Sequence, residues 1–440
     1  MKNILEKTFK LTEHKTTIRR EFLAGLITFL TMSYILIVNP SILSTTGMDR
    51  EALFTATVIS TVIATLVMAL YAKLPIALAP SMGLNAFFAF TICGVMGYSW
   101  RFALTAVLLE GILFIILSFF NIREIIVKSI PRVLKDAIPV GIGLFITLIG
   151  LKNAGIVVAN PATLVSLGDL SQHSVWIALL GLIITGVLLT RNVNGAILIG
   201  IVVATLFALV LGDIQFPETS IVSAPPSIAP VFAQFEWEHA LSLDMGIVVF
   251  TLLFVNLFDT AGTLIGVVSK AGLADENGDF PQMKKALLSD AIGSTVGGIL
   301  GTSTVTSYVE SASGVASGGR TGLTSVSTAL FFLLALFFAP LFLMVPAAAT
   351  SPALIIVGLF MISSVAKINF SDISEGLPAF ITIVFMPFTY SIAEGITYGM
   401  LSFALVKACS GRGKEVSTTV YVLAVLFLVK IVLNATHIFG

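Results

Sequence analysis

The stretch "LPIALAPSMGLNAFFAF", residues 74–90, is apolar enough for a membrane span but is not suited to one unbroken helix. Pro75 and Pro80 each lack a backbone N–H donor, and Gly83 weakens a helix interior. Irregular backbone at membrane depth persists only where protein or a water-filled cavity satisfies its polar groups. The stretch therefore predicts a broken span that borders a buried site.

The composition of the whole chain is typical of an all-α polytopic membrane protein. Of its 440 residues, 57% are hydrophobic and 11% are charged, and the mean hydropathy is +1.03. Apolar runs of about 20 residues, the length that crosses a bilayer as a helix, recur from end to end. The formal net charge of zero gives no indication of nucleic acid as a partner, so the expected surroundings are the lipid bilayer.

A second interrupted segment, "GTSTVTSYVESASGVASGG" at 301–319, is small, polar and rich in glycine. The succession of apolar runs places 74–90 in the third and 301–319 in the tenth of about fourteen predicted spans. With seven spans in each half, the halves enter the membrane from opposite sides, so the two repeats are inverted. A pair of broken segments at corresponding positions of inverted repeats indicates a secondary transporter.

The predicted organisation has four parts. Residues 1–21 form a polar segment, 22–212 the first repeat, 213–245 a linker, and 246–440 the second repeat with a C-terminal apolar segment. The linker contains no Lys or Arg, so the positive-inside rule predicts a cytoplasmic N-terminus and an extracytoplasmic linker in the cell (inner or plasma) membrane. The basic residues that precede the first span are Lys2, Lys7, Lys10, Lys15, Arg19 and Arg20.

Two carboxylates lie within predicted spans. Asp259 is the only formal charge between Met245 and Val268, and Glu310 lies in the second broken segment. Such a charge costs about 3 kcal/mol or more, which makes its residue a functional-site hypothesis. Asn85, in the first broken segment, is a third polar candidate. The alternative for each is structural: a backbone partner for the aspartate, a wet cavity around the glutamate, and helix packing by the amide.

Three further acidic residues fall in or beside predicted spans. Glu110 and Glu394 are interpreted as span-end residues whose carboxylates reach water. Asp290 closely follows two lysines, and the sequence leaves it open between a structural role and proton coupling. The two cysteines, Cys93 and Cys409, form no disulfide or metal-binding pattern, so we expect no metal site and no cofactor.

Four motifs together resemble the purine-permease branch of the nucleobase–ascorbate (xanthine/uracil permease) transporter family. The resemblance covers nearly the whole chain and implies a core domain of spans one to four and eight to eleven. It also implies a gate domain of spans five to seven and twelve to fourteen, and often a homodimer. Members of the branch carry adenine, or guanine and hypoxanthine. The motifs are "APSMGLNAFFAF", "NLFDTAGTLIGV", "SYVESASGVASGGRTGLT" and "GLFITLIGLKNAGIVVAN", which begin at residues 79, 256, 307 and 143.

The resemblance also implies roles for individual residues. The family's acidic base-binding residue of span eight matches Asp259, and its acidic or amide residue of span ten matches Glu310. The family writes E-N-x-G or Q-N-x-G in span ten, whereas here Gly314 comes one residue later, which leaves the register of Ser311 to Ser313 open. The other substrate-binding residues that the resemblance implies are Asn85, Ala86, Phe87, Thr263 and Tyr308.

These features predict a secondary active transporter that imports purine nucleobases by proton symport. A buried carboxylate only accepts hydrogen bonds, and so it suits the N–H donors of a neutral purine. A second desolvated carboxylate can take up a proton, and the candidates for proton coupling are Glu310 and Asp290. Phe87 is expected to stack on the planar base. The substrate prediction favours adenine, because "SMGLNAFFAF" resembles that side of the branch.

Other classes of protein fit the sequence less well. An intramembrane aspartyl protease is expected to carry a G-x-G-D motif, which this sequence lacks, so we expect no enzyme. A sulfate permease shares the fold in family terms, but its anion would be repelled by Asp259 and Glu310. The alternatives that remain are a passive channel and a transporter for another small planar solute on the same fold.

Overall fold

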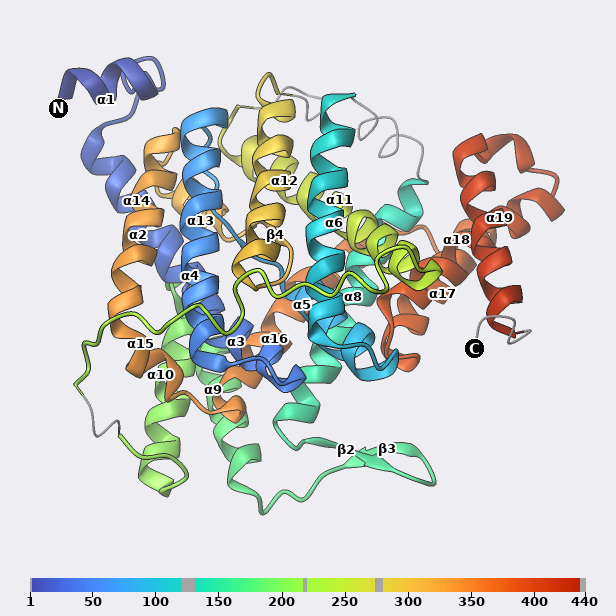
Figure 1. The fold of residues 1–440 in the computed structure, drawn as a ribbon, viewed down its shortest axis with the longest axis horizontal. Coiled ribbons are helices and arrows are strands. Elements are labelled where there is room, and N and C mark those ends of the chain that lie inside the picture. Colours follow the sequence, from blue (N-terminus) through green and yellow to red (C-terminus); the bar gives the residue numbers. More distant parts are fainter. Residues whose placement is uncertain (1, 121–130, 217–219, 274–279, 436–440) are drawn as a thin grey trace. The chain divides into compact units, whose positions relative to one another are not determined.

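The structure is a computed structural model, and it describes residues 2–120, 131–216, 220–273 and 280–435. The chain divides into two compact units, which are described separately (Figure 1). Unit 1 comprises Met1–Phe119 and Gly150–Ala353, and unit 2 comprises Phe120–Ile149 and Leu354–Gly440. The helices α8 (Arg132–Asn153) and α16 (Ala347–Ile362) each contribute residues to both units.

Unit 1 is a bundle of helices drawn from both halves of the sequence. Its N-terminal helices are α1 (Lys2–Phe9), α2 (Ile18–Met32), α3 (Ile35–Leu43), α4 (Arg50–Val67), α5 (Met82–Ala86), α6 (Trp100–Phe119), α9 (His173–Thr190) and α10 (Ala196–Leu211). Its later helices are α11 (Leu243–Lys270), α12 (Met283–Leu300), α13 (Ser311–Ala316), α14 (Gly322–Ala335) and α15 (Ala339–Leu343). Short 3-10 and π-helical segments join several of them: η1 (Ser44–Thr46), η2 (Met68–Ala72), η3 (Phe87–Val95) and η4 (Leu336–Phe338).

Two buried three-residue strands interrupt the helices of unit 1. β1 (Leu78–Pro80) pairs antiparallel with β4 (Val305–Ser307), and the backbone pairing continues for one residue beyond each end. A short helix follows each strand: α5 after β1 and, beyond residues 308–310, α13 after β4. The breaks predicted within 74–90 and 301–319 are therefore confirmed. The pairing brings two segments that are far apart in sequence to one place in the bundle.

Close helix packing surrounds this strand pair. α4, α12 and α6 run side by side in Figure 1, and glycines allow α6 and α12 to approach each other closely. A Cβ on Gly111 of α6 would lie 2.6 Å from the backbone nitrogen of Thr295 on α12. A buried apolar cluster drawn from α4, β1, α11, α12, β4 and α13 packs against the strands. Its members include Ala64, Leu78, Leu264, Ala286, Val305 and Val315.

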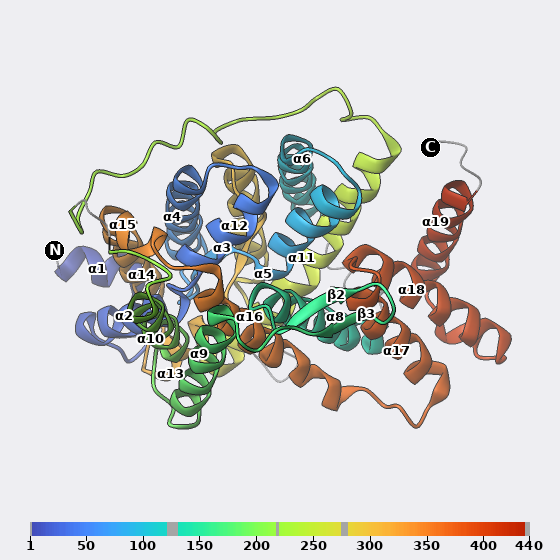
Figure 2. The same cartoon turned by 90° about the horizontal axis from the view of Figure 1, so that it is seen from below.

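The linker between α10 and α11 runs across the ends of several helices of unit 1 (Figure 2). Single hydrogen bonds attach it along its length to α4, α6, α12 and η4. These bonds join Thr55 to Pro226, Thr105 to Glu236, Ile299 to Ala233, and Phe337 to Ser223.

Earlier in the chain, between α8 and α9, β2 (Val157–Asn160) and β3 (Leu164–Leu167) form an antiparallel hairpin.

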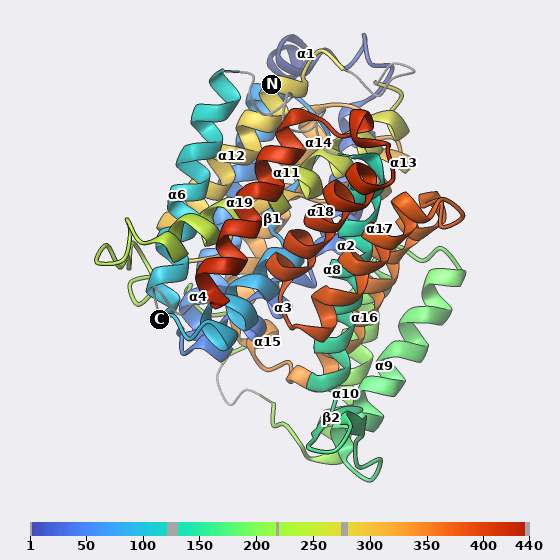
Figure 3. The same cartoon turned by 90° about the vertical axis from the view of Figure 1, so that its right-hand side faces the viewer.

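Unit 2 contains α17 (Ile373–Phe388), α18 (Ile392–Cys409) and α19 (Thr418–Ala435), which are labelled in Figure 3. Two 3-10 turns, η5 (Ser363–Lys367) and η6 (Gly413–Glu415), precede α17 and α19. α17 and α18 pack as an antiparallel pair, and Gly399 of α18 lies directly against Thr382 of α17.

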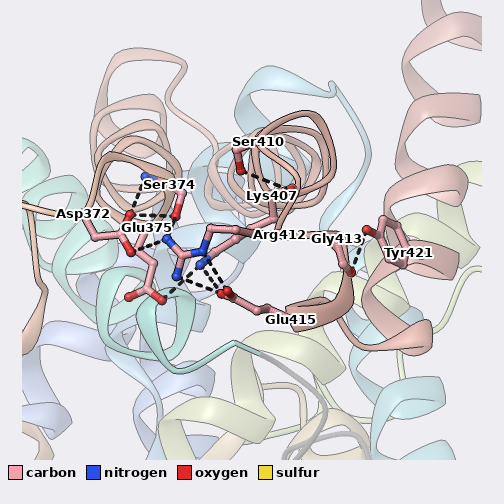
Figure 4. A network of polar contacts seen from close by, with 9 residues as sticks. All are labelled: Asp372, Ser374, Glu375, Lys407, Ser410, Arg412, Gly413, Glu415 and Tyr421. Carbon is pink, nitrogen blue, oxygen red and sulfur yellow. Dashed lines mark hydrogen bonds and ion pairs between the residues drawn. The ribbon is translucent and has the colours of Figure 1, made fainter.

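A charged network ties the ends of these helices together (Figure 4). The Arg412 guanidinium donates to Asp372, which caps α17, at 2.7 Å, and to both carboxylate oxygens of Glu415 at 2.7 and 2.9 Å. Lys407, whose side chain is only 1% exposed, lies 2.7 Å from Glu415 and 3.4 Å from Glu375. The network therefore connects the start of α17, the end of α18 and the turn before α19.

The expectation of a polytopic helical membrane protein is confirmed. Within the described residues, eight helices are long and apolar enough to cross a membrane, and shorter apolar helices accompany them. The count of about fourteen spans, which rests on span length, stays a prediction. So do the boundaries at 1–21, 22–212, 213–245 and 246–440, and the grouping into core and gate domains.

Candidate functional site

Asp259 connects α11 to both crossing strands. Its Oδ2 accepts a hydrogen bond from Ser81 Oγ at 2.8 Å and lies 3.4 Å from Thr306 Oγ1. Ser81 is the N-cap residue of α5, immediately after β1, and Thr306 is the middle residue of β4. The carboxylate thus lies at the point where the two broken spans meet.

Glu310 lies at the start of α13, next to the same strand pair. Its Oε1 accepts a hydrogen bond of 2.6 Å from the hydroxyl of Tyr34, a buried residue at the break between α2 and α3. Glu310 and Asp259 are close enough to interact electrostatically. The hydroxyl of Tyr308 donates to the carbonyl oxygen of Pro80 at 2.5 Å. The structure therefore brings together the two carboxylates that the sequence singled out.

Asn85 presents an unused hydrogen-bond donor. The residue is fully buried one turn after Ser81 on α5, and its Oδ1 accepts a hydrogen bond from Ser303. Within the described residues its Nδ2 has no hydrogen-bond partner. A buried donor without a partner is costly, and it indicates a place for a ligand or a water molecule. Ala86 and Phe87, which follow directly, are also buried.

The remaining candidates lie further along the same elements. Thr263 is half-buried on α11, one turn beyond Asp259. Asp290 is buried on α12, and its Oδ1 accepts hydrogen bonds from the N–H and the hydroxyl of Ser307 at 2.8 and 3.1 Å. Successive residues of a strand point to opposite faces, so β4 presents Thr306 to one acidic residue and Ser307 to the other. Asp259 and Asp290 therefore lie on opposite faces of β4.

The interpretation of Glu110 as a span-end residue that reaches water is wrong. Glu110 lies in the middle of α6 and is 0% exposed. Its Oε1 accepts a hydrogen bond of 2.8 Å from Asn256 Nδ2, so a side chain of the protein takes the place of water. Glu394 lies in the first turn of α18 and is half-buried.

Three hydroxyl side chains of the site were not predicted from the sequence: Ser81, Thr306 and Tyr34. Hydroxyl residues are common in membrane helices, where they bond to backbone carbonyls, so their presence alone is a weak signal. Ser81 could have been found, because it directly follows Pro80 and is placed to cap the helix after the break. The sequence gives no signal for the other two.

The chemistry of the site suits a neutral solute with both donors and acceptors. Two half-buried carboxylates, Asp259 and Glu310, offer acceptor oxygens, and the buried amide of Asn85 offers a donor. The described residues contain no group of three or more His, Cys, Asp or Glu side chains that could hold a metal ion. Two broken spans that cross inside a bundle of apolar helices are the architecture of a secondary transporter.

Comparison with known proteins places the chain in a family of transporters. Residues 19–398 match the sequence model of the Permease family (Xan_ur_permease), and the chain belongs to this family. The adenine permease AdeP of Escherichia coli (strain K12) is 49% identical over 434 residues, which cover 99% of this chain and 97% of the relative. The guanine/hypoxanthine permease PbuG of Bacillus subtilis (strain 168) is 43% identical over 432 residues, covering 96% and 98%. The resemblance to the purine-permease branch is confirmed.

A solved structure shares the fold at low sequence identity. The transmembrane domain of the cyanobacterial bicarbonate transporter BicA matches with a TM-score of 0.65 and 17% identity. The match covers 86% of this chain and 96% of that domain. The family match and the eight long apolar helices within the described residues together identify the protein as a multi-pass membrane permease.

Proposed function

We propose that this protein imports purine nucleobases, with adenine favoured, across the cell membrane by proton symport. The support from the comparisons is that its relatives include permeases for adenine and for guanine and hypoxanthine, with similarity over nearly the full length. We further propose that the N-terminus is cytoplasmic, because basic residues cluster there and are missing from the linker at 213–245.

The observation that carries the proposal is the pairing of acceptors with an unused donor beside the strand crossing. A purine offers N–H donors and ring nitrogen acceptors on one edge. Asp259 and Glu310 accept from the base, and the unpartnered Nδ2 of Asn85 donates to a ring nitrogen. Around these polar groups, the neighbours proposed to border the base are Ala86, Phe87, Thr263 and Tyr308.

Proton coupling is assigned to Glu310, with Asp290 as the second candidate. Both are carboxyl groups on the elements that flank the strand crossing, so a change of charge on either would act directly on the site. If proton and purine each favour the same inward-open state, the proton gradient drives accumulation. The homodimer that the resemblance implies stays a prediction.

Guanine and hypoxanthine are the alternative cargo, because PbuG, a guanine/hypoxanthine permease, is 43% identical to this chain. A passive channel, or a carrier of another small planar solute, would also be compatible with the fold. An anion such as bicarbonate, the ion named in the description of the structural neighbour BicA, fits poorly beside the carboxyl groups of Asp259 and Glu310.

The test is uptake of radiolabelled adenine into cells that lack their own purine permeases, with unlabelled purines as competitors. We expect saturable accumulation that guanine and hypoxanthine inhibit less well than adenine, and that a proton ionophore abolishes. Uptake that never exceeds the external concentration would identify a channel. Preferential inhibition by guanine would transfer the substrate assignment to the alternative cargo, and accumulation that resists the ionophore would exclude proton coupling.

A further inference from the structure

A second polar assembly lies behind the substrate site, on α6, α11 and α12. Asn256 Nδ2 donates to Glu110 Oε1 at 2.8 Å, and Thr260 Oγ1 lies 2.9 Å from Asn256 Oδ1. The same hydroxyl lies 2.7 Å from Asp290 Oδ2. All four side chains are fully buried. They form one continuous hydrogen-bonded chain with a carboxyl group at each end, here called the relay: Glu110, Asn256, Thr260 and Asp290.

The geometry of the relay requires a proton at one of its ends. The Thr260 hydroxyl has one proton and two acceptor oxygens within bonding distance, Asn256 Oδ1 and Asp290 Oδ2. If the hydroxyl donates to the amide oxygen, the contact with Asp290 is a hydrogen bond only when Asp290 is protonated and donates. The amide nitrogen of Asn256 then donates to an ionised Glu110.

The opposite orientation of the same chain keeps the relay continuous, although it gives up the 3.2 Å bond from Asn256 Nδ2 to Ser294, whose own hydroxyl donates to Val305. A protonated Glu110 would donate to the amide oxygen of Asn256 once the amide has turned over, and the amide nitrogen would donate to Thr260. The Thr260 hydroxyl would then donate to an ionised Asp290. In either orientation one proton is shared by two carboxyl groups, and two buried like charges disfavour its loss.

The relay touches the strand that holds the substrate site. Asp290 is bonded to Ser307, and Glu110 Oε2 lies 3.5 Å from Thr304, on the two sides of Thr306 in sequence. Asp259, which Thr306 contacts, also neighbours Thr260 on α11. A change in the charge of the relay therefore acts on the two elements, β4 and α11, that position Asp259.

Other titratable groups lie on the neighbouring elements, and several of them are at helix ends. α4 carries charge only in its first turn, and α12 carries its lysines in its own first turn, where Lys285 lies over the ring of Tyr71. The titratable residues on the elements packed against the relay are Arg50, Glu51, Tyr71, Cys93, Arg101, Asp244, Asp259, Lys270, Lys284, Lys285, Tyr308 and Glu310.

We propose that Glu110 is a positioning residue for proton coupling, which shares one proton with Asp290 through Asn256 and Thr260. This inference rests on the proposed function for its physiological meaning, because the charge of the relay acts on the elements that position Asp259, whereas the transported proton is assigned first to Glu310. The existence of the shared proton does not depend on the identity of the substrate. Glu110 itself is not placed in contact with the purine.

The first test is the infrared C=O band of protonated carboxyl groups in purified protein, titrated from about pH 5 to about pH 9. In Glu110→Gln the like charge is lost, and the new amide can support an ionised Asp290 through the inverted chain. We expect the midpoint of the band to move by about one pH unit or more toward acid, a tenfold change in proton affinity. Glu51→Gln, the same change at an exposed site of α4, should leave the titration unchanged.

Transport provides the second readout. Exchange of labelled for unlabelled adenine should persist in Glu110→Gln, whereas the pH profile of net uptake should move toward acid with the infrared midpoint. Thr260→Val cuts the relay without removing either carboxyl group. In a protein that carries Thr260→Val, adding Glu110→Gln should therefore shift the infrared midpoint less than it does in the wild type. Thr260→Val also tests the inference if Glu110→Gln does not fold, because Thr260→Val should itself shift the midpoint of the infrared titration.

Two outcomes would overturn the inference: an infrared titration of Glu110→Gln or Thr260→Val that matches wild type, or full additivity of the two changes. A wild-type protein that shows the titrating band but transports no purine would instead reject the proposed function. The infrared result therefore separates failure of the relay from failure of the substrate assignment.

Discussion

Asp259 already accepts hydrogen bonds from hydroxyl groups of both crossing strands, and its carboxylate has lone pairs left for N–H donors of a base. In Asp259→Asn the amide nitrogen faces donors, so a charge-assisted bond is lost. Such a bond contributes about 1.5–3 kcal/mol, so adenine binding to the purified variant should weaken roughly 10- to 150-fold. Calorimetry or a radioligand assay measures this change.

The matched control for this prediction is Asp244→Asn in the first turn of the same helix. Asp244 is bonded to Tyr98, away from the strand crossing, so its variant should bind adenine like wild type. If Asp259→Asn retains wild-type affinity, Asp259 has only a structural role in tying α11 to β1 and β4.

Glu310→Gln separates binding from coupling. Glutamine resembles the protonated acid, and Tyr34 can still donate to its amide oxygen, so the variant should fold and bind adenine. Exchange across proteoliposome membranes should continue, but accumulation against a gradient should be lost, because residue 310 no longer binds or releases a proton. Accumulation with the wild-type pH profile would instead leave Asp290 as the proton carrier.

At the residue scale, the sequence indicated site residues through the free-energy cost of placing a charged side chain in an apolar span. Asp259 and Glu310 could be predicted because a charge in an apolar span is expensive. Glu110 has the same signal but was assigned to a span end, since the amide of Asn256 that solvates it comes from a helix 146 residues away in sequence. Long-range partners of this kind are set by packing and cannot be read from local pattern.

At the scale of elements, the two breaks followed from Pro80, Gly83 and the small polar residues of 301–319. The strand pairing itself could not be predicted, because three-residue strands have too little alternation to specify a register. Close helix packing explains why the motif of the second broken segment has a glycine at position 314. A Cβ on Gly314 would lie 2.6 Å from the carbonyl oxygen of Ala24, so only glycine lets α13 approach α2 this closely.

The charged network at the ends of α17, α18 and α19 should make the order of unit 2 sensitive to acid. Hydrogen bonds from Arg412 and then Ser374 lower the pKa of Asp372 to about 2, and those from Arg412 and then Lys407 lower the pKa of Glu415 to about 2. Both carboxyl groups are more acidic in the folded protein than in the unfolded chain. Their contribution is therefore complete above the ordinary pKa values of 3.8 and 4.5, and is lost as the pH falls toward about 2.

Hydrogen exchange at the start of α17 and in the turn before α19 measures this effect. Protection should be constant from neutral pH to about 4.5 and should fall below it, after correction for the intrinsic pH dependence of exchange. Arg412→Gln should lower protection at neutral pH and remove most of the acid transition. An unchanged transition in this variant would mean that other groups cause it.

For the whole molecule, composition and the recurrence of apolar runs were sufficient to predict a polytopic helical protein. The motifs were sufficient to predict its family, because they include the residues around both breaks. The division into two compact units was not predicted. Contacts between helices depend on side-chain fit over long sequence separations, and unit 1 draws α9 and α10 together with helices from both halves.

The strand crossing has a consequence for how the polypeptide can be divided. β1 comes from the chain before the linker and β4 from the chain after it, and α6 packs on α12 across the same boundary. Each fragment therefore lacks the partner that completes its broken span. Two polypeptides produced by a break near Pro225, in the exposed linker, should each be degraded when made alone. Made together in one cell they should copurify and bind adenine, so the covalent connection between the halves is dispensable while their mutual presence is not.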